Sequence, residues 1–255
     1  MLRSGVIGII PARFGSTRFP GKPLSMINGK TMIQRVFEQA KKSRCLSRTI
    51  VATDDQRIYD HVCQFGGDVL MTSPLHLSGT DRCGEAVRIL QDTSNDPSSL
   101  KIVINIQGDE PFLDPLQIDQ VAALFDHPAV TIATLARLII RTEELDDPNT
   151  VKVVFNNNKK VLTFSRTALP FQRNLPRQQW IDHHPYYKHI GVYGFRLDTL
   201  QQIISLPVSP LETAESLEQL RWLENGYDIY LDICDQESVA IDTPEDLLKL
   251  SNRTE

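Results

Sequence analysis

The chain has 255 residues, a formal net charge of −5, and 41% hydrophobic and 23% charged residues, which are ordinary values for a globular protein. The negative balance argues against a nucleic-acid binder, which needs a broad basic face, and no apolar run reaches the length of a membrane span. The apolar run near the start is too short for a signal peptide, and four scattered cysteines favour a reduced, cytoplasmic protein without a zinc site.

The first expected element is a buried strand over Val6–Ile10, because the run is short, β-branched and bounded by Pro11. Apolar residues from Ile33 to Ala40 then recur at helical spacing. A strand, a loop and a helix in this order are the first unit of an open α/β sheet, and ligands of such sheets bind at the carboxyl ends of the strands. The loop after Ile10 is therefore expected to face a ligand.

The composition of this loop favours a polyphosphate ligand. It combines cations with small and hydroxyl residues, namely Arg13, Gly15, Ser16, Thr17, Arg18, Gly21 and Lys22. Fixed cations and exposed backbone amides together suit phosphate groups. The loop is not a Walker A motif, since five residues separate the two glycines and Pro23 follows the lysine. The alternative is a solvated basic loop without a ligand.

The next elements continue the alternation of strands and helices. A strand is expected over Thr49–Thr53, a helix ends at Gly66, and a third strand covers Asp68–Met71. This βαβαβ order predicts a parallel sheet with right-handed crossovers. Ser78–Arg82 then opens a helix, either as a simple cap or as a site for a nucleobase edge. We favour the nucleobase site, because a cap needs only one of these residues.

The apolar run Lys101–Ile106 predicts a central strand, and Gln107–Pro111 stands at its carboxyl end. Acidic residues at the tip of a buried strand are metal ligands in many phosphoryl-transfer sites. A plain turn before a helix at Pro115 is the alternative. Because a turn needs no pair of acids, we favour Asp109 as a Mg²⁺ ligand.

After residue 130 the pattern changes. Strand-like runs at 130–135, 151–155 and 161–165 predict antiparallel pieces, the last two joined in a hairpin by a run of asparagines. Residues 171–185 are expected to form a long surface loop, and Tyr187–Phe195 alternates like a strand. These pieces are candidates to bind the second substrate and a partner subunit.

The last part of the chain is expected to hold a helix over Ser216–Asn225, strands near 228–233 and 238–241, and a final helix capped by Thr243. The cap does not need Asp242, which follows an apolar run much as Asp109 does. Two aspartates at strand ends and one basic loop predict a metal–nucleotide site.

Several motifs in this order resemble one family. They are Pro-Ala-Arg-x-x-Ser-x-Arg-x-Pro-Gly-Lys-Pro-Leu, Ser-Gly-Thr-Asp-Arg, Gln-Gly-Asp-Glu-Pro and Asp-Thr-Pro-Glu-Asp. Together they resemble the 3-deoxy-manno-octulosonate (Kdo) cytidylyltransferases, and the resemblance covers essentially the whole chain. The first motif is shared with CMP-sialic acid synthetases, whereas Phe-Ser-Arg, His-x-Gly-x-Tyr and Leu-Glu-Gln-Leu-Arg are what point to Kdo.

The resemblance implies a fold of the nucleotide-diphospho-sugar transferase type. This is a Rossmann-like α/β fold with a mostly parallel central sheet flanked by helices and an antiparallel arm in the second half. We expect one domain over residues 1–255. Its nucleotide-binding half covers about 1–130, and its sugar-binding and dimerisation elements cover about 131–225.

The resemblance also implies a cytoplasmic, Mg²⁺-dependent homodimer that makes CMP-Kdo and pyrophosphate from CTP and Kdo for lipopolysaccharide synthesis. The matching nucleotide-binding positions are Ala12, Arg13, Ser16, Arg18, Lys22, Ser78, Gly79, Thr80 and Arg82. The matching sugar-binding positions are Gln107, Arg166, His189, Tyr193, Glu218 and Gln219. Asp109 and Asp242 match the Mg²⁺ ligands, and with Arg13 and Lys22 they form the expected catalytic set.

The sequence departs from the family mainly near the sugar end. Phe171-Gln172 stands where Trp-Asp is more common, and Thr213-Ala214 stands where His-Ile is more common. Two alternatives stay open: a synthetase for another acid sugar such as sialic acid, and a non-catalytic nucleotide-binding protein.

The reaction itself is an in-line attack of the anomeric hydroxyl on the α-phosphorus, and it needs cations already in place. No convincing protein base is found. His189 is given a binding role, and Arg166 is the natural bidentate partner of the sugar carboxylate.

Overall fold

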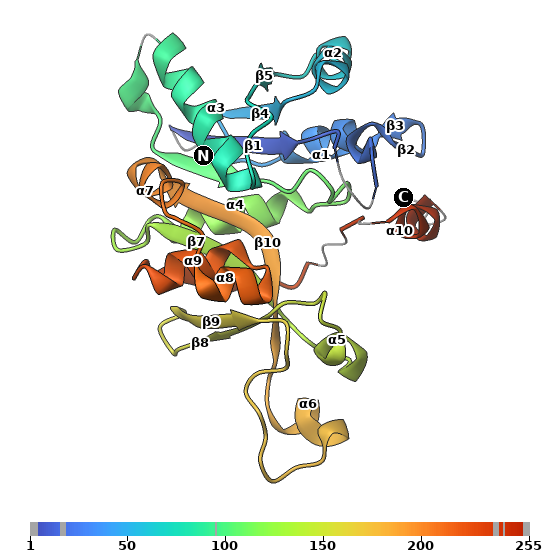
Figure 1. The fold of residues 1–255 in the computed structure, drawn as a ribbon, viewed down its shortest axis with the longest axis vertical. Helices are drawn as coiled ribbons and strands as arrows, with labels where there is room; N and C mark the ends of the chain where they lie inside the picture. The colour runs from blue at the N-terminus through green and yellow to red at the C-terminus, as the bar shows by residue number, and fades with distance from the viewer. Residues whose placement is uncertain (1–4, 16–18, 95, 237–239, 242, 252–255) are drawn as a thin grey trace.

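The fold is organised by one nine-stranded sheet. The computed structural model describes residues 5–15, 19–94, 96–236, 240–241 and 243–251. Seven strands follow one another across the sheet in the order β11, β7, β10, β6, β1, β4, β5 (Figure 1). Their bounds are β1 Val6–Ala12, β4 Arg48–Thr53, β5 Val69–Met71, β6 Ile102–Asn105, β7 Ile132–Leu138, β10 Tyr187–Arg196 and β11 Ile229–Ile233. The predicted α/β class with a mostly parallel sheet is confirmed.

Helices cover both faces of this sheet, because each presents one apolar stripe to it. One face carries α1 (Met32–Ala40), α2 (Gln56–Gln64) and α4 (Pro115–Leu124), whose buried side chains share one core cluster. The other face carries α3 (Gly79–Thr93), α7 (Leu197–Ile203) and α9 (Glu218–Glu224). The central strands are buried on both faces, as expected of near-continuous apolar runs.

Strand β1 is longer than predicted and includes Pro11. Pairing with β6 covers only Val6–Ile9, whereas pairing with β4 continues to Ala12. The missing N–H of Pro11 therefore falls beyond the end of the β6 ladder and costs little. The strand then delivers Ala12 and Arg13 to the carboxyl edge of the sheet.

Strand β10 connects the sheet to the arm. It pairs antiparallel with both β6 and β7, and in Figure 1 it runs upward from the segment that carries α6 (Trp180–His183). The predicted hairpin forms as β8 (Lys152–Phe155) and β9 (Val161–Ser165), and Lys152 of β8 pairs with Lys188 of β10. The antiparallel arm of the second half is thus confirmed.

Three details differ from the sequence prediction. Residues 171–185 are not simply a surface loop, since η3 (Arg177–Gln179) and α6 form there and Trp180 is buried in an aromatic cluster of the arm. The helix expected from Ser216 begins at Glu218, because Ser216 adopts a left-handed conformation that ends α8 (Pro210–Glu215). Of the strand expected at 238–241, residues 240 and 241 are not in a strand, and 238–239 lie outside the described residues.

Several short elements are additional to those predicted. They are η1 (Lys22–Leu24), β2 (Met26–Ile27), β3 (Lys30–Thr31), η2 (Pro97–Ser99), α5 (Thr142–Asp146), α7 and α8. The last helix, α10 (Pro244–Ser251), is present as predicted. The Thr243 hydroxyl accepts from the Asp246 amide at 3.2 Å, which confirms the predicted cap.

Candidate active site

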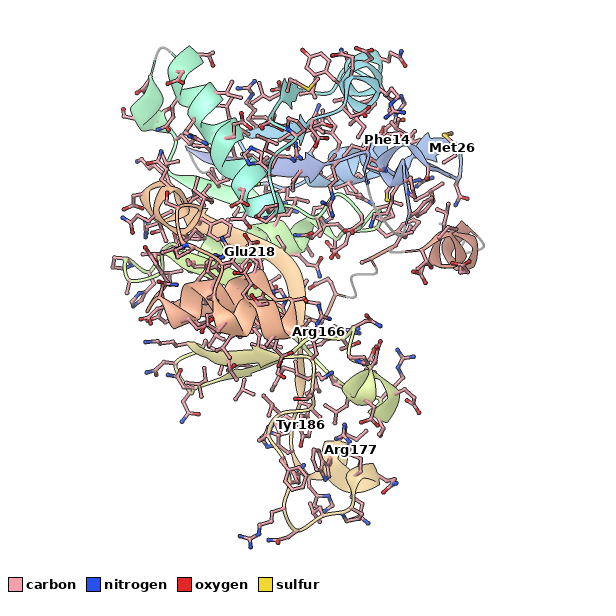
Figure 2. All side chains as sticks on the ribbon, in the orientation of Figure 1. Phe14, Met26, Arg166, Arg177, Tyr186 and Glu218 are labelled. Atoms are coloured by element: carbon pink, nitrogen blue, oxygen red, sulfur yellow. The ribbon has the colours of Figure 1, made fainter. Side chains whose placement is uncertain are left out.

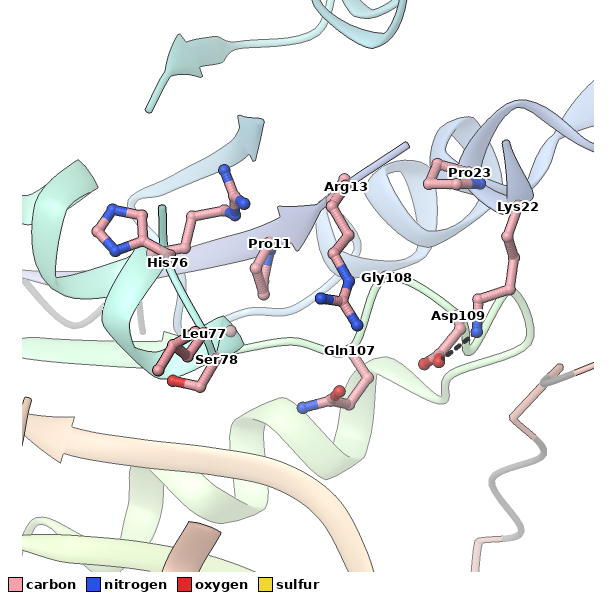
Figure 3. Close-up of a pocket in the computed structure, with 13 residues that line it drawn as sticks. Pro11, Arg13, Lys22, Pro23, His76, Leu77, Ser78, Gln107, Gly108 and Asp109 are labelled. Carbon is pink, nitrogen blue, oxygen red and sulfur yellow. Dashed lines mark hydrogen bonds and ion pairs between the residues drawn. The ribbon is translucent and has the colours of Figure 1, made fainter. Parts of the chain in front are cut away.

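A cavity of about 250 Å³ opens at the carboxyl ends of β1 and β6, where the sequence placed the ligand. Its lining comes from the β1–η1 loop, the β5–α3 loop and the segment after β6 (Figure 3). The residues are Pro11, Ala12, Arg13, Lys22, Pro23, His76, Leu77, Ser78, Gly79, Arg82, Gln107, Gly108 and Asp109. Eight of these were predicted as site residues.

The loop after β1 is shaped by a tight closure. Gly21 has a φ of 72°, and its N–H donates to the Phe14 carbonyl at 2.9 Å. This closure sets Lys22 at the start of η1, beside the pocket. Arg13 is exposed and has no hydrogen bond or ion pair within the described part of the chain, so its guanidinium is available to an anion.

Lys22 and Asp109 form an ion pair at one end of the pocket. The Nζ–Oδ2 distance is 2.8 Å, and Nζ also donates to the Ile241 carbonyl at 2.9 Å. The Ile241 amide in turn donates to the Asp109 carbonyl at 2.9 Å, which ties the segment before α10 to this edge. The predicted phosphate cation and the predicted metal ligand are therefore neighbours. Ser16, Arg18 and Asp242 lie outside the described residues.

At the other end of the pocket, Ser78 caps α3. Its hydroxyl accepts from the Asp81 amide at 3.0 Å, and the Asp81 carboxylate accepts from the Ser78 amide. Ser78 therefore caps α3 and, with Gly79, also lines the pocket. The cap is thus compatible with a nucleobase site at the same residues, and that site stays a prediction. Thr80 is buried, and its hydroxyl donates to Glu218 on α9 at 2.8 Å.

Arg82 lines the pocket, but its guanidinium is engaged on the protein side. It donates to the Asp54 carboxylate at 2.7 Å and to the Thr72 hydroxyl at 2.6 Å. A direct contact between Arg82 and nucleotide stays a prediction. In this structure its charge joins the end of β4 to the start of the β5–α3 loop.

The predicted sugar-binding residues form a second group beside the pocket. Gln107 connects the two, because it lines the cavity and donates through Nε2 to the Gly191 carbonyl of β10 at 3.0 Å. The other predicted sugar-binding residues lie outside the cavity lining: Arg166, His189, Tyr193, Glu218 and the buried Gln219. The ring centroids of His189 and Tyr193 are 5.0 Å apart, so the two side chains lie on the same side of β10.

His189 and Tyr193 lie on the same side of β10 although the strand is irregular between them. Ile190 pairs with Leu135 and Tyr193 with Thr134, so β10 holds two extra residues there. Two extra residues preserve the alternation of side chains, whereas one would have reversed it.

Burial controls the protonation of the sugar-side group. It lowers the pKa of His189 to about 3 and raises the pKa of Tyr193 well above its ordinary value, with a further contribution from Glu218. Burial also raises the pKa of Glu218, although hydrogen bonds from Ser78 and Thr80 lower it. The Tyr193 hydroxyl is buried without a hydrogen-bond partner among the described residues.

The tautomer of His189 follows from Thr134. The Thr134 hydroxyl carries one proton and donates it to the Val192 carbonyl at 2.8 Å, so it accepts from Nε2 of His189 at 3.0 Å. Nδ1 of the neutral ring is then an acceptor, able to receive a hydrogen bond from a ligand hydroxyl.

Arg166 is held differently from the expectation. Its guanidinium donates to three backbone carbonyls, those of Glu215 at 2.6 Å, Pro148 at 2.9 Å and Ser216 at 3.3 Å. Figure 2 shows it where the β8–β9 hairpin meets the arm, away from Glu218 on α9. Recognition of a sugar carboxylate by Arg166 stays a prediction.

Five lining residues were not among the predicted site residues: Pro11, Pro23, His76, Leu77 and Gly108. Pro11, Pro23 and Gly108 belong to the motifs themselves, whereas His76 and Leu77 are adjacent to one. A Cβ on Gly108 would lie 2.8 Å from the Pro11 carbonyl oxygen, so only glycine lets the segment after β6 pass this close to β1. His76 and Leu77 immediately precede Ser78.

The described residues contain no helix long and apolar enough to cross a membrane. Nor do they hold a cluster of three or more His, Cys, Asp or Glu side chains suited to a metal ion.

The chain is similar in sequence to known cytidylyltransferases. The family model described as cytidylyltransferase matches residues 7–229. A relative from Bacteroides thetaiotaomicron, named 3-deoxy-manno-octulosonate cytidylyltransferase, is 52% identical and aligns over 94% of both chains. A relative from Shewanella baltica, named 8-amino-3,8-dideoxy-manno-octulosonate cytidylyltransferase, is 47% identical over 96% of both.

Solved structures show the same likeness. CMP:2-keto-3-deoxy-manno-octonic acid synthetase complexed with CTP superposes with a TM-score of 0.85, at 40% identity over 97% of both chains. A 4-diphosphocytidyl-2C-methyl-D-erythritol synthase from Anaerococcus prevotii, at 11% identity and a TM-score of 0.60 over 97% of both chains, shares the fold. With the family model matching most of its length, the chain belongs to the cytidylyltransferase family.

Proposed function

We propose that the protein transfers CMP from CTP to the anomeric hydroxyl of Kdo, releasing pyrophosphate. The observation that carries this proposal is the continuity of the two groups of residues. A cavity with a phosphate-type loop and a strand-end aspartate is joined through Gln107 to the polar group on β10. The relatives named for this sugar align over nearly the whole chain, so both groups lie within the matched region.

The nucleotide half supplies positive charge where phosphoryl oxygens gain negative charge. Arg13 is free to contact the triphosphate, and Lys22 reaches the same end of the pocket from η1. Groups held in place before the reaction stabilise the developing charge without reorganisation. The small residues Ser78 and Gly79 leave room for the nucleoside at the opposite end.

The residues of this end also fit a Mg²⁺ ion. Asp109 offers a hard carboxylate oxygen at the pocket edge, and Lys22 already balances its negative charge. We propose Asp109 as a ligand, with Asp242 as its partner from the sequence. Such an ion, when bound, neutralises phosphate charge and lowers the pKa of the attacking hydroxyl.

The metal assignment is tested with Asp109→Asn, which keeps the shape of the side chain and removes its charge. We expect weaker Mg²⁺ binding by calorimetry in the presence of CTP, and loss of most turnover. Asp68→Asn, which removes an exposed carboxylate paired with Arg48, is the control. Unchanged Mg²⁺ affinity in Asp109→Asn would remove this residue from the metal site.

The sugar half offers groups that suit hydroxyls. Nδ1 of His189 is an acceptor, and the Tyr193 hydroxyl has no partner within the described residues. Glu218 adds a half-buried carboxyl that already accepts a hydrogen bond from the Thr80 hydroxyl. We infer that a sugar with several hydroxyls completes these hydrogen bonds, whereas a hydrophobic acceptor would leave them unmet.

We further propose that the enzyme works as a cytoplasmic homodimer in lipopolysaccharide synthesis. Support comes from the arm, which exposes Ile140 at 64% and Phe171 at 73% among other apolar side chains. Light scattering of the purified protein tests the dimer, and Ile140→Glu combined with Phe171→Glu should shift it toward monomer. A monomeric wild type would contradict this proposal.

The function is tested by a pyrophosphate-release assay that crosses four nucleoside triphosphates with Kdo, its 8-amino analogue and sialic acid. Release only with CTP and Kdo is the expected result. Preference for the 8-amino sugar would place the chain with the Shewanella relatives, and preference for sialic acid would overturn the sugar assignment. Nucleotide binding without any turnover would leave only a non-catalytic nucleotide-binding protein.

A further inference from the structure

The loop between β5 and α3, residues 72–78, has an unusual arrangement of side chains. Leu75 and Leu77 are 83% and 81% exposed, whereas the histidine between them is turned inward. The hydrophobic effect alone would favour the opposite arrangement, because burying a leucine is more favourable than burying an imidazole. Other contacts must therefore impose this conformation.

Two residues one turn apart on α3 supply those contacts. Glu85 accepts the Ser73 amide at 2.7 Å and the Nε2 atom of His76 on the same carboxylate oxygen, Oε2. Arg82 holds the start of the loop, through the Thr72 hydroxyl at 2.6 Å and the Ser73 carbonyl at 3.4 Å. Residues three apart lie on one helix face, so Arg82 and Glu85 act on the loop from the same side.

The hydrogen bonds to Glu85 are made to a charged group. Burial acts to raise the pKa of Glu85, but the Ser73 amide, His76 and Arg88 together lower it below its ordinary value. Such charge-assisted bonds are stronger than neutral ones.

The held loop forms one end of the pocket. His76, Leu77 and Ser78 line the cavity at the end opposite Lys22 and Asp109, with Arg13 and Gln107 between them (Figure 3). Apart from Arg82, whose guanidinium is engaged by Asp54 and Thr72, this end holds small and apolar groups such as Leu77 and Ser78, whereas the other end holds the ion pair of Lys22 and Asp109. The loop therefore faces the nucleoside half of a nucleotide and not its phosphates.

We infer that Glu85 and His76 are positioning residues for the nucleoside: their hydrogen bond fixes residues 73–78 so that Leu77 packs against the base and ribose. Glu85 does not line the cavity and acts only through the loop. The exposed Leu77 gains an apolar contact when the nucleotide binds. The inference rests on the cytidylyltransferase activity of the proposed function, and it is independent of the identity of the sugar.

The test separates the two ends of the pocket by measuring CMP and pyrophosphate binding calorimetrically. Glu85→Gln and His76→Leu should bind CMP about 10-fold more weakly, since each loses a hydrogen bond to a charged group, and should bind pyrophosphate like the wild type. His76→Gln places an amide N–H near the position of Nε2 and should restore most of the CMP affinity. Asp92→Asn, an exposed carboxylate on the same helix, is the matched control.

Thermal melting of each variant identifies any that fail to fold; if Glu85→Gln or His76→Leu does not fold, the other of the two carries the test. Unchanged CMP affinity in Glu85→Gln and His76→Leu would overturn the inference. An equal loss of CMP and pyrophosphate binding, or no rescue by His76→Gln, would do the same. A wild type that binds neither CMP nor CTP would instead contradict the proposed function.

Discussion

Lys22 and Asp109 illustrate how a site holds charge before its ligand arrives. Each is a partly buried ion in a pocket, and their 2.8 Å pair neutralises both. A triphosphate and a divalent cation would bring the opposite charges, so each side chain can exchange its partner for a ligand without leaving a buried charge unpaired. The pair thus keeps both charges compensated in the pocket before the ligands bind.

Lys22→Ala is expected to lower kcat by about 100-fold, or about 3 kcal/mol in activation free energy, because Lys22 contacts charge that grows during transfer. The measurement is steady-state kinetics with CTP and the sugar varied in turn. Lys30→Ala, which breaks an exposed ion pair with Glu38, is the matched control and should change neither constant. If only the KM for CTP rises, Lys22 binds the ground state and does not stabilise the transition state.

At the scale of elements, Arg166 acts as a junction. Its guanidinium joins the end of β9 to the carbonyl of Pro148 and to the corner between α8 and α9. The carboxylate of Glu215 accepts hydrogen bonds from the backbone amide of Arg166 at 2.9 Å and from the Ser165 hydroxyl at 2.7 Å. Three segments of the second half are therefore fixed to one another at Arg166.

Arg166→Lys should raise the KM for the sugar and lower the melting temperature, with the KM for CTP unchanged. Lysine carries the charge but cannot donate in three fixed directions as the planar guanidinium does. Kinetics with each substrate and a thermal melt provide both readouts. Arg173→Lys, an exposed arginine in the same half of the chain, is the control. A selective loss in CTP binding would contradict the assignment of this region to the sugar.

Elements with strong periodic patterns were predictable, and those set by long-range contacts were not. The apolar run of β6 and the spacing of α1 gave their type and position, since burial on the sheet explains both. The α8 helix is only six residues long and depends on a capping box at Ser209, while Ser216 takes a left-handed conformation in a non-glycine residue. The start of α8 has a local signal in Ser209, Pro210 and Glu212, whereas its end at the left-handed Ser216 has none.

The same limit applies to the site. Motif residues such as Arg13, Lys22 and Asp109 were found because they cluster at strand ends. The engagement of Arg82 with Asp54, and of Arg166 with backbone carbonyls, depends on segments distant in the sequence, so residue type alone suggested ligand contacts instead.

At the scale of the whole molecule, β10 connects the nucleotide pocket to the predicted sugar-binding residues. It pairs with β6, whose end leads to Gln107 and Asp109, and it carries His189 and Tyr193 toward the arm. The neutral state of the half-buried His189 therefore affects the stability of the entire sheet as well as the sugar site.

This coupling predicts a loss of stability in mild acid. The folded pKa of His189 is about 3, against an ordinary value of 6.5 in the unfolded chain, so between these values the unfolded state binds more protons. Stability then falls as the pH drops below 6.5, and at pH 5 the loss from this residue reaches at most about 2 kcal/mol. Glu218, whose folded pKa is raised, acts in the opposite direction, because its ionisation disfavours the folded state as the pH rises.

Urea unfolding of wild type, His189→Gln and the exposed-histidine control His183→Gln at pH 7.5 and pH 5 isolates the contribution of His189. Glutamine can still donate to Thr134 but does not titrate, so His189→Gln should lose less stability in acid than the wild type, while His183→Gln should follow the wild type; equal pH dependence in all three would show that His189 does not stay neutral in the folded protein.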